Sequence, residues 1–140
     1  MTDEAYKAHV FLREIRKLSI LMAISELEQK DWFNKAQGCG SYSSELKVQS
    51  SAKGDAMEAA IVKLVELEEE HERMLGDLLA KMQTALAMFE DLTADEISIL
   101  KLYYFHRYTD ESISGIIHLS RQRVNQIRHQ ALGSIGRKMA

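Results

Sequence analysis

The densest group of side chains that could do chemistry follows Ser120, near the end of the 140-residue chain. Helical spacing places four of them opposite the apolar side of that segment: Arg121, Gln122, Asn125 and Gln126. Arginine can donate to both acceptors of a guanine edge, and Gln or Asn can pair with adenine through two hydrogen bonds. A helix that starts at Ser120 also directs free backbone amides outward, which suits a phosphate. The pattern predicts a helix that reads double-stranded DNA in the major groove.

Arg123 and Arg128 lie at the flanks of this face, where contacts with DNA phosphates are expected. The full set of candidate DNA contacts is Thr109, Ser120, Arg121, Gln122, Arg123, Asn125, Gln126, Arg128, His129, Arg137 and Lys138. The distribution of charge supports the set, because residues 112–140 carry +5 with no acid while the other 111 residues carry −8. The alternative is that these are solvated polar positions on a surface helix, and it weighs most on His129, Arg137 and Lys138.

The other chemistry-bearing residues do not form a pattern typical of an enzyme. The histidines are scattered along the chain, and Glu68 with His71 has the spacing of a di-iron helical bundle but lacks the second such pair that a bundle needs. The single Cys39 cannot form an internal disulfide or a cysteine metal cluster. No glycine-rich phosphate loop, nucleophile elbow or zinc motif is present. We therefore expect a protein without enzymatic activity, metal or cofactor.

The elements that must position the candidate residues are all expected to be helices. Proline is absent and 46% of the residues are hydrophobic, so long uninterrupted helices with a core are favoured. Apolar residues recur at helical spacing over residues 5–36 and 55–91, and the glycines and serines of 37–54 indicate a loop between them. The expected helix seams are Phe11, Ile15, Leu18, Met22, Ser25, Gln29 and Trp32, and Met57, Ile61, Leu64, His71, Leu75, Leu78, Met82 and Phe89. The sequence predicts a long antiparallel helical hairpin over residues 1–91.

Capping residues divide residues 92–140 into three shorter predicted helices. Thr93 and Glu96 have the spacing of a capping box, and Thr109 and Ser120 can cap two further helices. The tight break before Ser120 is typical of a helix-turn-helix. The predicted fold is all-α, with the hairpin domain at 1–91 followed by a three-helix DNA-binding domain at 92–140.

Residues 92–139 resemble the fourth region of bacterial primary sigma factors, which binds the promoter −35 element. The resemblance is carried by Leu119-Ser120-Arg121-Gln122-Arg123-Val124-Asn125-Gln126-Ile127 and Ala131-Leu132, and upstream by Glu96, Leu100, Leu102 and Tyr104. Gln122 and Asn125 replace a Glu and an Arg of the family pattern, which alters the expected base preference. Ser112 stands where the family has Glu. His118 stands where the family frequently has Gly, so a positive φ is expected there.

A recurring pattern is formed by Val48-Gln49-Ser50-Ser51, Asp55, Val62, Lys63, Leu64, Leu67 and Glu68. Through it the whole chain is also similar to small phage and prophage proteins with sigma-like C-termini, which are regarded as transcription regulators. The resemblance implies a DNA-binding regulator, and the lack of promoter-melting parts argues against independent initiation. Two alternatives stay open: an RNA polymerase-binding adaptor that mimics sigma, because the family's fourth region also contacts the polymerase flap, and a phage DNA-packaging subunit of the small-terminase kind.

The wide apolar stripes on both long helices predict a homo-oligomer, most simply a dimer. The sequence has no run of about 18 apolar residues and no basic-then-apolar leader, so we expect a cytoplasmic protein without a membrane span.

Overall fold

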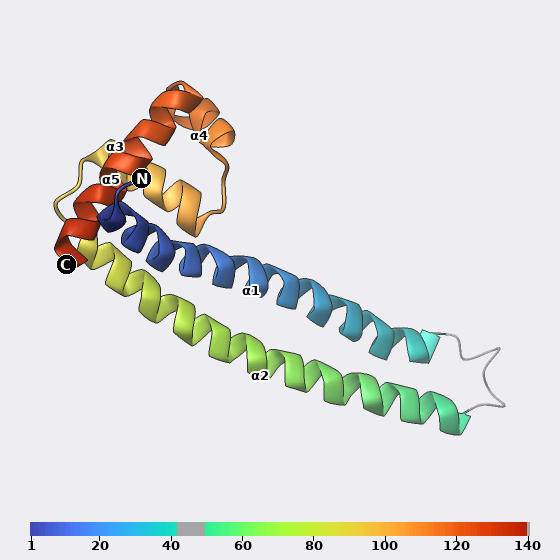
Figure 1. The fold of residues 1–140 in the computed structure, drawn as a ribbon. Helices are drawn as coiled ribbons and strands as arrows, with labels where there is room; N and C mark the ends of the chain where they lie inside the picture. Colours follow the sequence, from blue (N-terminus) through green and yellow to red (C-terminus); the bar gives the residue numbers. More distant parts are fainter. Residues whose placement is uncertain (42–49, 140) are drawn as a thin grey trace. The chain divides into compact units, whose positions relative to one another are not determined.

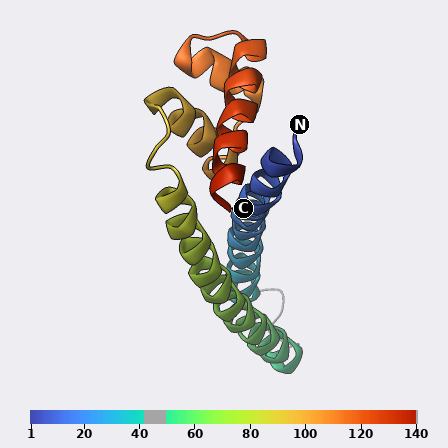
Figure 2. The same cartoon turned by 60° about the vertical axis from the view of Figure 1, so that its left-hand side comes forward.

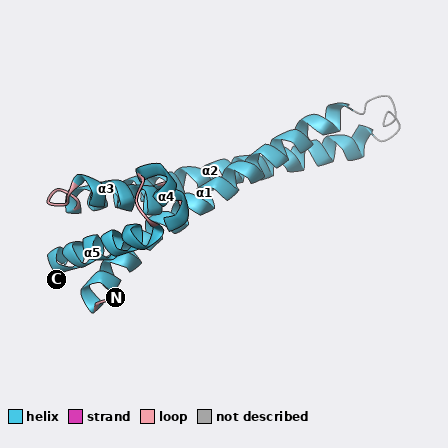
Figure 3. Cartoon of the chain, turned by 90° about the horizontal axis from the view of Figure 1, so that it is seen from above, coloured by secondary structure: helices cyan, strands magenta, loops and turns pink. Residues whose placement is uncertain are grey.

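The computed structural model describes residues 1–41 and 50–139, and all elements in this part of the chain are helical (Figure 3). Two long helices, α1 (Asp3–Ser41) and α2 (Ser50–Met88), are followed by α3 (Ala94–Leu100), a π-helical turn η2 (Lys101–Phe105), α4 (Asp110–Ile117) and α5 (Arg121–Met139) (Figure 1). The predicted all-α fold with a long N-terminal helical hairpin and a C-terminal three-helix part is therefore confirmed. Within the described residues, no helix is long and apolar enough to cross a membrane.

Helix α1 ends later, and helix α2 begins earlier, than the sequence predicted. Residues 37–41 and 50–54 were predicted to belong to a loop but are helical, including Gly38, Gly40 and Gly54. A glycine in a helix interior costs only about 1 kcal/mol, while each residue added to an existing helix gains a backbone hydrogen bond. The rest of the predicted loop, residues 42–49, lies outside the described residues.

The contacts divide the chain into two compact units, Met1–Ile20 with Asp77–Ala140, and Leu21–Gly76. The first unit therefore contains the start of α1 and the end of α2 together with all the shorter helices. The predicted domain boundary before residue 92 concerns independent folding, which this division does not measure, and it stays a prediction.

The unit Leu21–Gly76 is an antiparallel pair of helical segments whose buried residues combine small and polar side chains with one leucine. Ser25, Ala60 and Leu67 are buried, and Gln29 donates a hydrogen bond from Nε2 to Ser25 Oγ over 3.2 Å. The Nδ1 atom of His71 is buried without a hydrogen-bond partner.

Large apolar side chains of this unit lie on its outside: Leu21, Ile24, Leu27, Phe33, Met57, Ile61, Val62, Val65 and Leu75 are all exposed. The predicted seam was therefore wrong at Met57, Ile61 and Leu75. Two neighbouring apolar stripes run along α2, and the buried Ala60 and Leu67 lie on one of them.

The core of the other unit brings together segments far apart in sequence. One cluster comprises the buried Ile99, Ile113, Val124 and Ile127, from α3, α4 and α5. The start of α1 adds the buried Ala5, Ala8, Leu12 and Ile15. Ile15 belongs to the predicted seam, whereas the predicted Phe11 is only half-buried and its neighbour Leu12 is buried instead. The last turns of α5 lie beside the first turns of α1 (Figure 2). At the closest point Gly136 contacts the backbone of Glu4, so that any Cβ would overlap the Glu4 carbonyl group.

The local signals of the C-terminal helices are confirmed. Thr93 and Glu96 form the capping box, with Glu96 N donating to Thr93 Oγ1 (3.3 Å) and Thr93 N donating to Glu96 Oε1 (3.1 Å). Thr109 and Ser120 cap α4 and α5 by accepting from the amides three residues on, at 3.2 and 3.1 Å. His118 ends α4 in the left-handed region, with φ 60° and ψ 37°, as the resemblance implied.

The close approach at Gly136 gives a prediction with an internal control. Gly136→Ala should lower the free energy of unfolding by about 1–3 kcal/mol, because the added methyl group forces the backbones of α1 and α5 apart. Gly133→Ala, on the same helix, meets only the Arg137 Nη1 atom at 3.9 Å and should raise it by up to about 1 kcal/mol through helix propensity. Urea denaturation of the two variants checks this, and an equal effect of both substitutions would contradict it.

Candidate DNA interface

The exposed face of α5 begins directly at its capped N-terminus. Arg121, Gln122, Arg123 and Gln126 are exposed, whereas Val124 and Ile127 on the opposite side are buried. Arg123 Nη1 donates to Gln126 Oε1 over 3.5 Å, so the two side chains lie next to each other on the surface. Four of the predicted contact residues are therefore accessible on one surface, with guanidinium and amide groups that can reach base edges or phosphates.

Asn125 does not share this exposed face. Its side chain is half-buried, and its Nδ2 atom donates to Asp110 Oδ2 over 3.1 Å. The sequence placed Asn125 opposite the apolar side of the helix, and the structure corrects this position. The carboxylate of Asp110, the first residue of α4, accepts this hydrogen bond and so turns the Asn125 amide inward.

Arg128 was expected at the flank of the DNA-binding face, and the structure contradicts that position. Its side chain is only 7% exposed and forms a two-pronged ion pair with Asp110, from Nε to Oδ1 (3.2 Å) and from Nη2 to Oδ2 (3.1 Å). Its guanidinium also lies 4.1 Å from the centre of the Tyr103 ring. Arg128 follows Val124 by four residues and precedes Ala131 by three, so helical spacing already placed it on the inner stripe.

Tyr103 is held between two arginines from different helices. The guanidinium of Arg16 in α1 lies 4.1 Å from the ring centre, the same distance as that of Arg128 in α5. The π-helical turn that carries Tyr103 is closed by His106 N donating to Lys101 O at 3.0 Å, one residue wider than an α-helical turn. Sequence analysis missed Tyr103, Arg16 and Asp110, because none of them belongs to the periodic exposed pattern.

The electrostatics around Asp110 favour its charged form. Burial would raise the pKa of the Asp110 carboxyl, but hydrogen bonds from Arg128 and Asn125 outweigh it and hold the pKa below its usual value. Burial acts against the charge of Arg128, and its bonds to Asp110 raise the pKa of the guanidinium despite that. The pair therefore stays ionised, and Asp110 offsets one of the five positive charges counted for residues 112–140.

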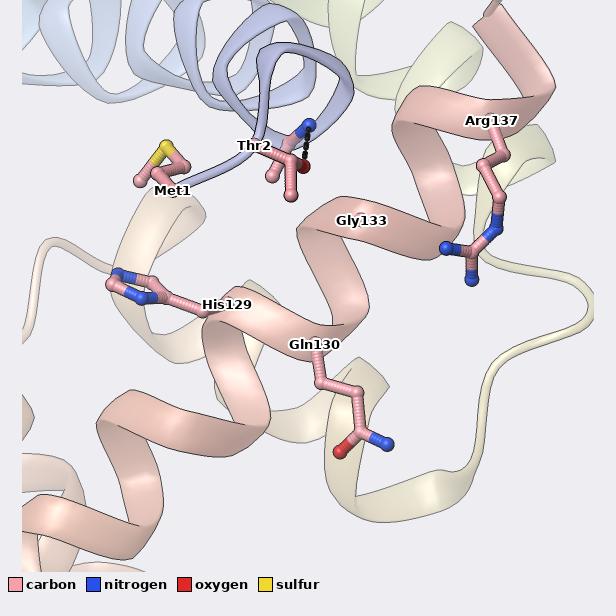
Figure 4. A pocket seen from close by; sticks show the side chains of 7 residues that line it. Met1, Thr2, His129, Gln130, Gly133 and Arg137 are labelled. Carbon is pink, nitrogen blue, oxygen red and sulfur yellow. Dashed lines mark hydrogen bonds between the residues drawn. The ribbon is translucent and has the colours of Figure 1, made fainter.

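The second half of α5 carries three further predicted contacts, His129, Arg137 and Lys138. An open pocket at this end of α5 is lined by Met1, Thr2, His129, Gln130, Gly133 and Arg137 (Figure 4). Arg137 is exposed and donates from Nη2 to Ser134 Oγ over 3.2 Å. Lys138 is engaged within the protein, with Nζ 3.0 Å from Asp91 Oδ2 and 3.1 Å from the carbonyl oxygen of Met88 at the end of α2. A phosphate contact of Lys138 would have to compete with these two partners.

A second polar contact ties α1 to the π-helical turn. His9 Nδ1 and the hydroxyl of Tyr104 are 2.8 Å apart, and the Tyr104 side chain is fully buried. Burial raises the pKa of Tyr104 to about 12. Burial also lowers the pKa of His9, and the charges of Arg128 and Arg13 lower it further. The interior of this unit therefore favours neutral His9.

Comparison with known proteins identifies the C-terminal part. Residues 88–135 match the family model "Sigma-70, region 4", which spans α3, η2, α4 and most of α5. No curated protein and no solved structure matches the chain. The chain therefore contains a sigma region 4-like helix-turn-helix, a DNA-binding class of domain, over about a third of its length.

Among the described residues there is no group of three or more His, Cys, Asp or Glu side chains that could hold a metal ion. Glu68 and His71 belong to the Leu21–Gly76 unit, outside the matched residues 88–135.

The lowered pKa of His9 predicts a pH-dependent stability. In the unfolded chain the imidazole titrates near 6.5, but in the folded protein it titrates lower, so the unfolded chain binds more protons below pH 6.5. The free energy of unfolding should therefore decrease as the pH falls from 6.5 to the folded pKa, and His9→Gln should flatten this slope. His129 has a pKa lowered by burial and by Arg128, so the double substitution with His129→Gln should flatten it further. Urea denaturation between pH 5 and 8 measures the slope, and an unchanged slope in the double variant would exclude this explanation.

Proposed function

We propose that this protein is a DNA-binding transcriptional regulator that inserts the N-terminal half of α5 into the major groove. The observation that carries the proposal is the exposed set of Arg121, Gln122, Arg123 and Gln126 within a unit that matches sigma region 4. A recognition helix typically contacts base edges with residues of its N-terminal end, which is where these side chains lie. The protein acts by binding, without enzymatic activity, metal or cofactor.

The resemblance to small phage regulators supports a phage or prophage origin. Residues 1–91 would then supply oligomerisation or partner contacts to the DNA-binding part.

An RNA polymerase adaptor is the second candidate function. The match to region 4 supports it equally, because in sigma factors this region also contacts the polymerase flap. Copurification with RNA polymerase that survives substitution of Arg121, Gln122 and Gln126 would favour the adaptor. A DNA-packaging subunit would instead assemble into rings of many copies.

Selection of bound sequences from a random DNA pool tests the main proposal and supplies the preferred site. On that site Gln126→Ala should cost about 1–3 kcal/mol of binding free energy, because Gln126 faces a base edge. On random DNA the same substitution should change the affinity little, because phosphates carry no sequence information. Fluorescence anisotropy at stated salt concentrations measures both affinities.

Arg137 serves as the matched comparison on the same helix, about 16 Å from Gln126 along the axis. Arg137→Ala should weaken binding to both DNAs equally and reduce the slope of log affinity against log salt by roughly one. Equal losses on both DNAs for Gln126→Ala would reduce Gln126 to a backbone contact.

We also propose that the protein is a homodimer that buries the outer apolar faces of the Leu21–Gly76 unit. Ile24 is 45% exposed and Ile61 49% exposed, whereas the neighbouring Ser25 and Ala60 are buried. Two such hairpins would form a four-helix bundle with the large apolar residues inside.

Light scattering at micromolar concentration should give about twice the monomer mass of 16.0 kDa. Ile61→Glu should give a monomer, because it places a charge in the proposed interface. Lys63→Glu changes the net charge more but lies on another side of the helix, so it should leave the dimer intact. A wild-type monomer at every accessible concentration would refute the proposed dimer.

A further inference from the structure

The carboxylate of Asp110 joins α4 to two residues of α5 that bracket the proposed base-reading residue. Oδ1 accepts from Arg128 Nε at 3.2 Å, and Oδ2 accepts from Arg128 Nη2 and from Asn125 Nδ2, each at 3.1 Å. Gln126 lies between these two donors in sequence, directly after Asn125. Both oxygens of one carboxylate are therefore used to hold the stretch of helix that carries Gln126.

The far side of Arg128 is held as well. Its guanidinium lies over the ring of Tyr103, and the guanidinium of Arg16 lies over the same ring. A two-pronged contact with a carboxylate sets the direction of the guanidinium plane, and the aromatic ring restricts its movement perpendicular to that plane. The Arg128 side chain is therefore restrained by an edge contact and a face contact at once.

We propose that Asp110 is a positioning residue for DNA sequence recognition, which acts through Asn125 and Arg128 to set the rotation of α5 about its own axis. This inference rests on the proposed function. Gln122 and Gln126 project from the exposed side of α5, so a rotation of the helix displaces their amide groups across the groove. Two-point pairing with a base edge depends on alignment of both hydrogen bonds, whereas phosphate contacts tolerate displacement. Loss of Asp110 should therefore reduce discrimination between sequences more than it reduces binding.

The ratio of affinities for the selected site and for random DNA separates positioning from mere stability. A substitution that only unfolds part of the protein lowers the active concentration, and this reduces both apparent affinities by the same factor. A substitution that misaligns α5 reduces the affinity for the selected site alone. We expect Asp110→Asn, measured with full-length protein that circular dichroism shows to be folded, to lower the ratio about tenfold.

Glu111→Gln is the matched control for charge. Glu111 is the next residue of α4, is exposed, and its substitution removes one negative charge from the same helical turn. Removing an acid near DNA should strengthen binding to both DNAs equally, so the ratio should not change. Asp110→Glu is the second variant in case Asp110→Asn does not fold. It keeps the charge but places it one methylene further out, and it too should lower the ratio selectively.

A double-mutant cycle with Arg128→Gln tests whether Asp110 acts through Arg128. If it does, the double substitution should lower the ratio no further than Asp110→Asn alone, about tenfold. Additive losses, near a hundredfold in the double variant, would overturn the positioning role, as would equal losses on both DNAs for Asp110→Asn or Asp110→Glu.

The outcome for the wild-type protein separates this inference from the proposed function. A wild-type preference for the selected site that Asp110→Asn leaves intact would overturn this inference alone. A wild-type protein without any sequence preference would overturn both.

Discussion

The packing of α3, α4 and α5 depends on the free-energy cost of burying the charge of Arg128. A guanidinium removed from water is tolerated only where hydrogen bonds and an opposite charge compensate for the lost hydration. Asp110 supplies the charge and two of the acceptors, and the face of Tyr103 covers the plane. This single requirement brings together the first residue of α4, the π-helical turn and the middle of α5. Arg16 extends the same contact to α1.

The two departures from the sigma family pattern in α5 have different consequences. Gln122 is exposed beside the other candidate base contacts, so its replacement of Glu changes which bases the surface can pair with. Asn125 turns toward Asp110 and contributes to the contact between α4 and α5. The resemblance to the sigma motif therefore predicted the fold and the exposed side of α5. It did not predict the contact of Asn125 with Asp110.

The Leu21–Gly76 unit shows that helical periodicity in the sequence does not decide which side of a helix packs against its neighbour. Its buried residues are Ser25, Ala60 and Leu67, and larger residues such as Leu27 and Val65 lie outside. Helical spacing alone does not decide which of two neighbouring apolar stripes faces the partner helix. The remaining stripe exposes many large apolar side chains to solvent. Their burial against a second copy is the physical basis for the proposed dimer.

The sequence by itself determined most of each helix, the caps and the exposed side of α5 that carries Arg121, Gln122 and Gln126. A cap depends on one side chain and an amide three residues on, so Thr93, Thr109 and Ser120 mark helix starts without any tertiary information. Only the tertiary structure decided that Asn125 turns inward, that Asp110 is the partner of Arg128, and that the start of α1 packs with α3, α4 and α5. The direction of a polar side chain at the edge of a helix face depends on which group packs against it. For Asn125 that group is Asp110, fifteen residues earlier on another helix.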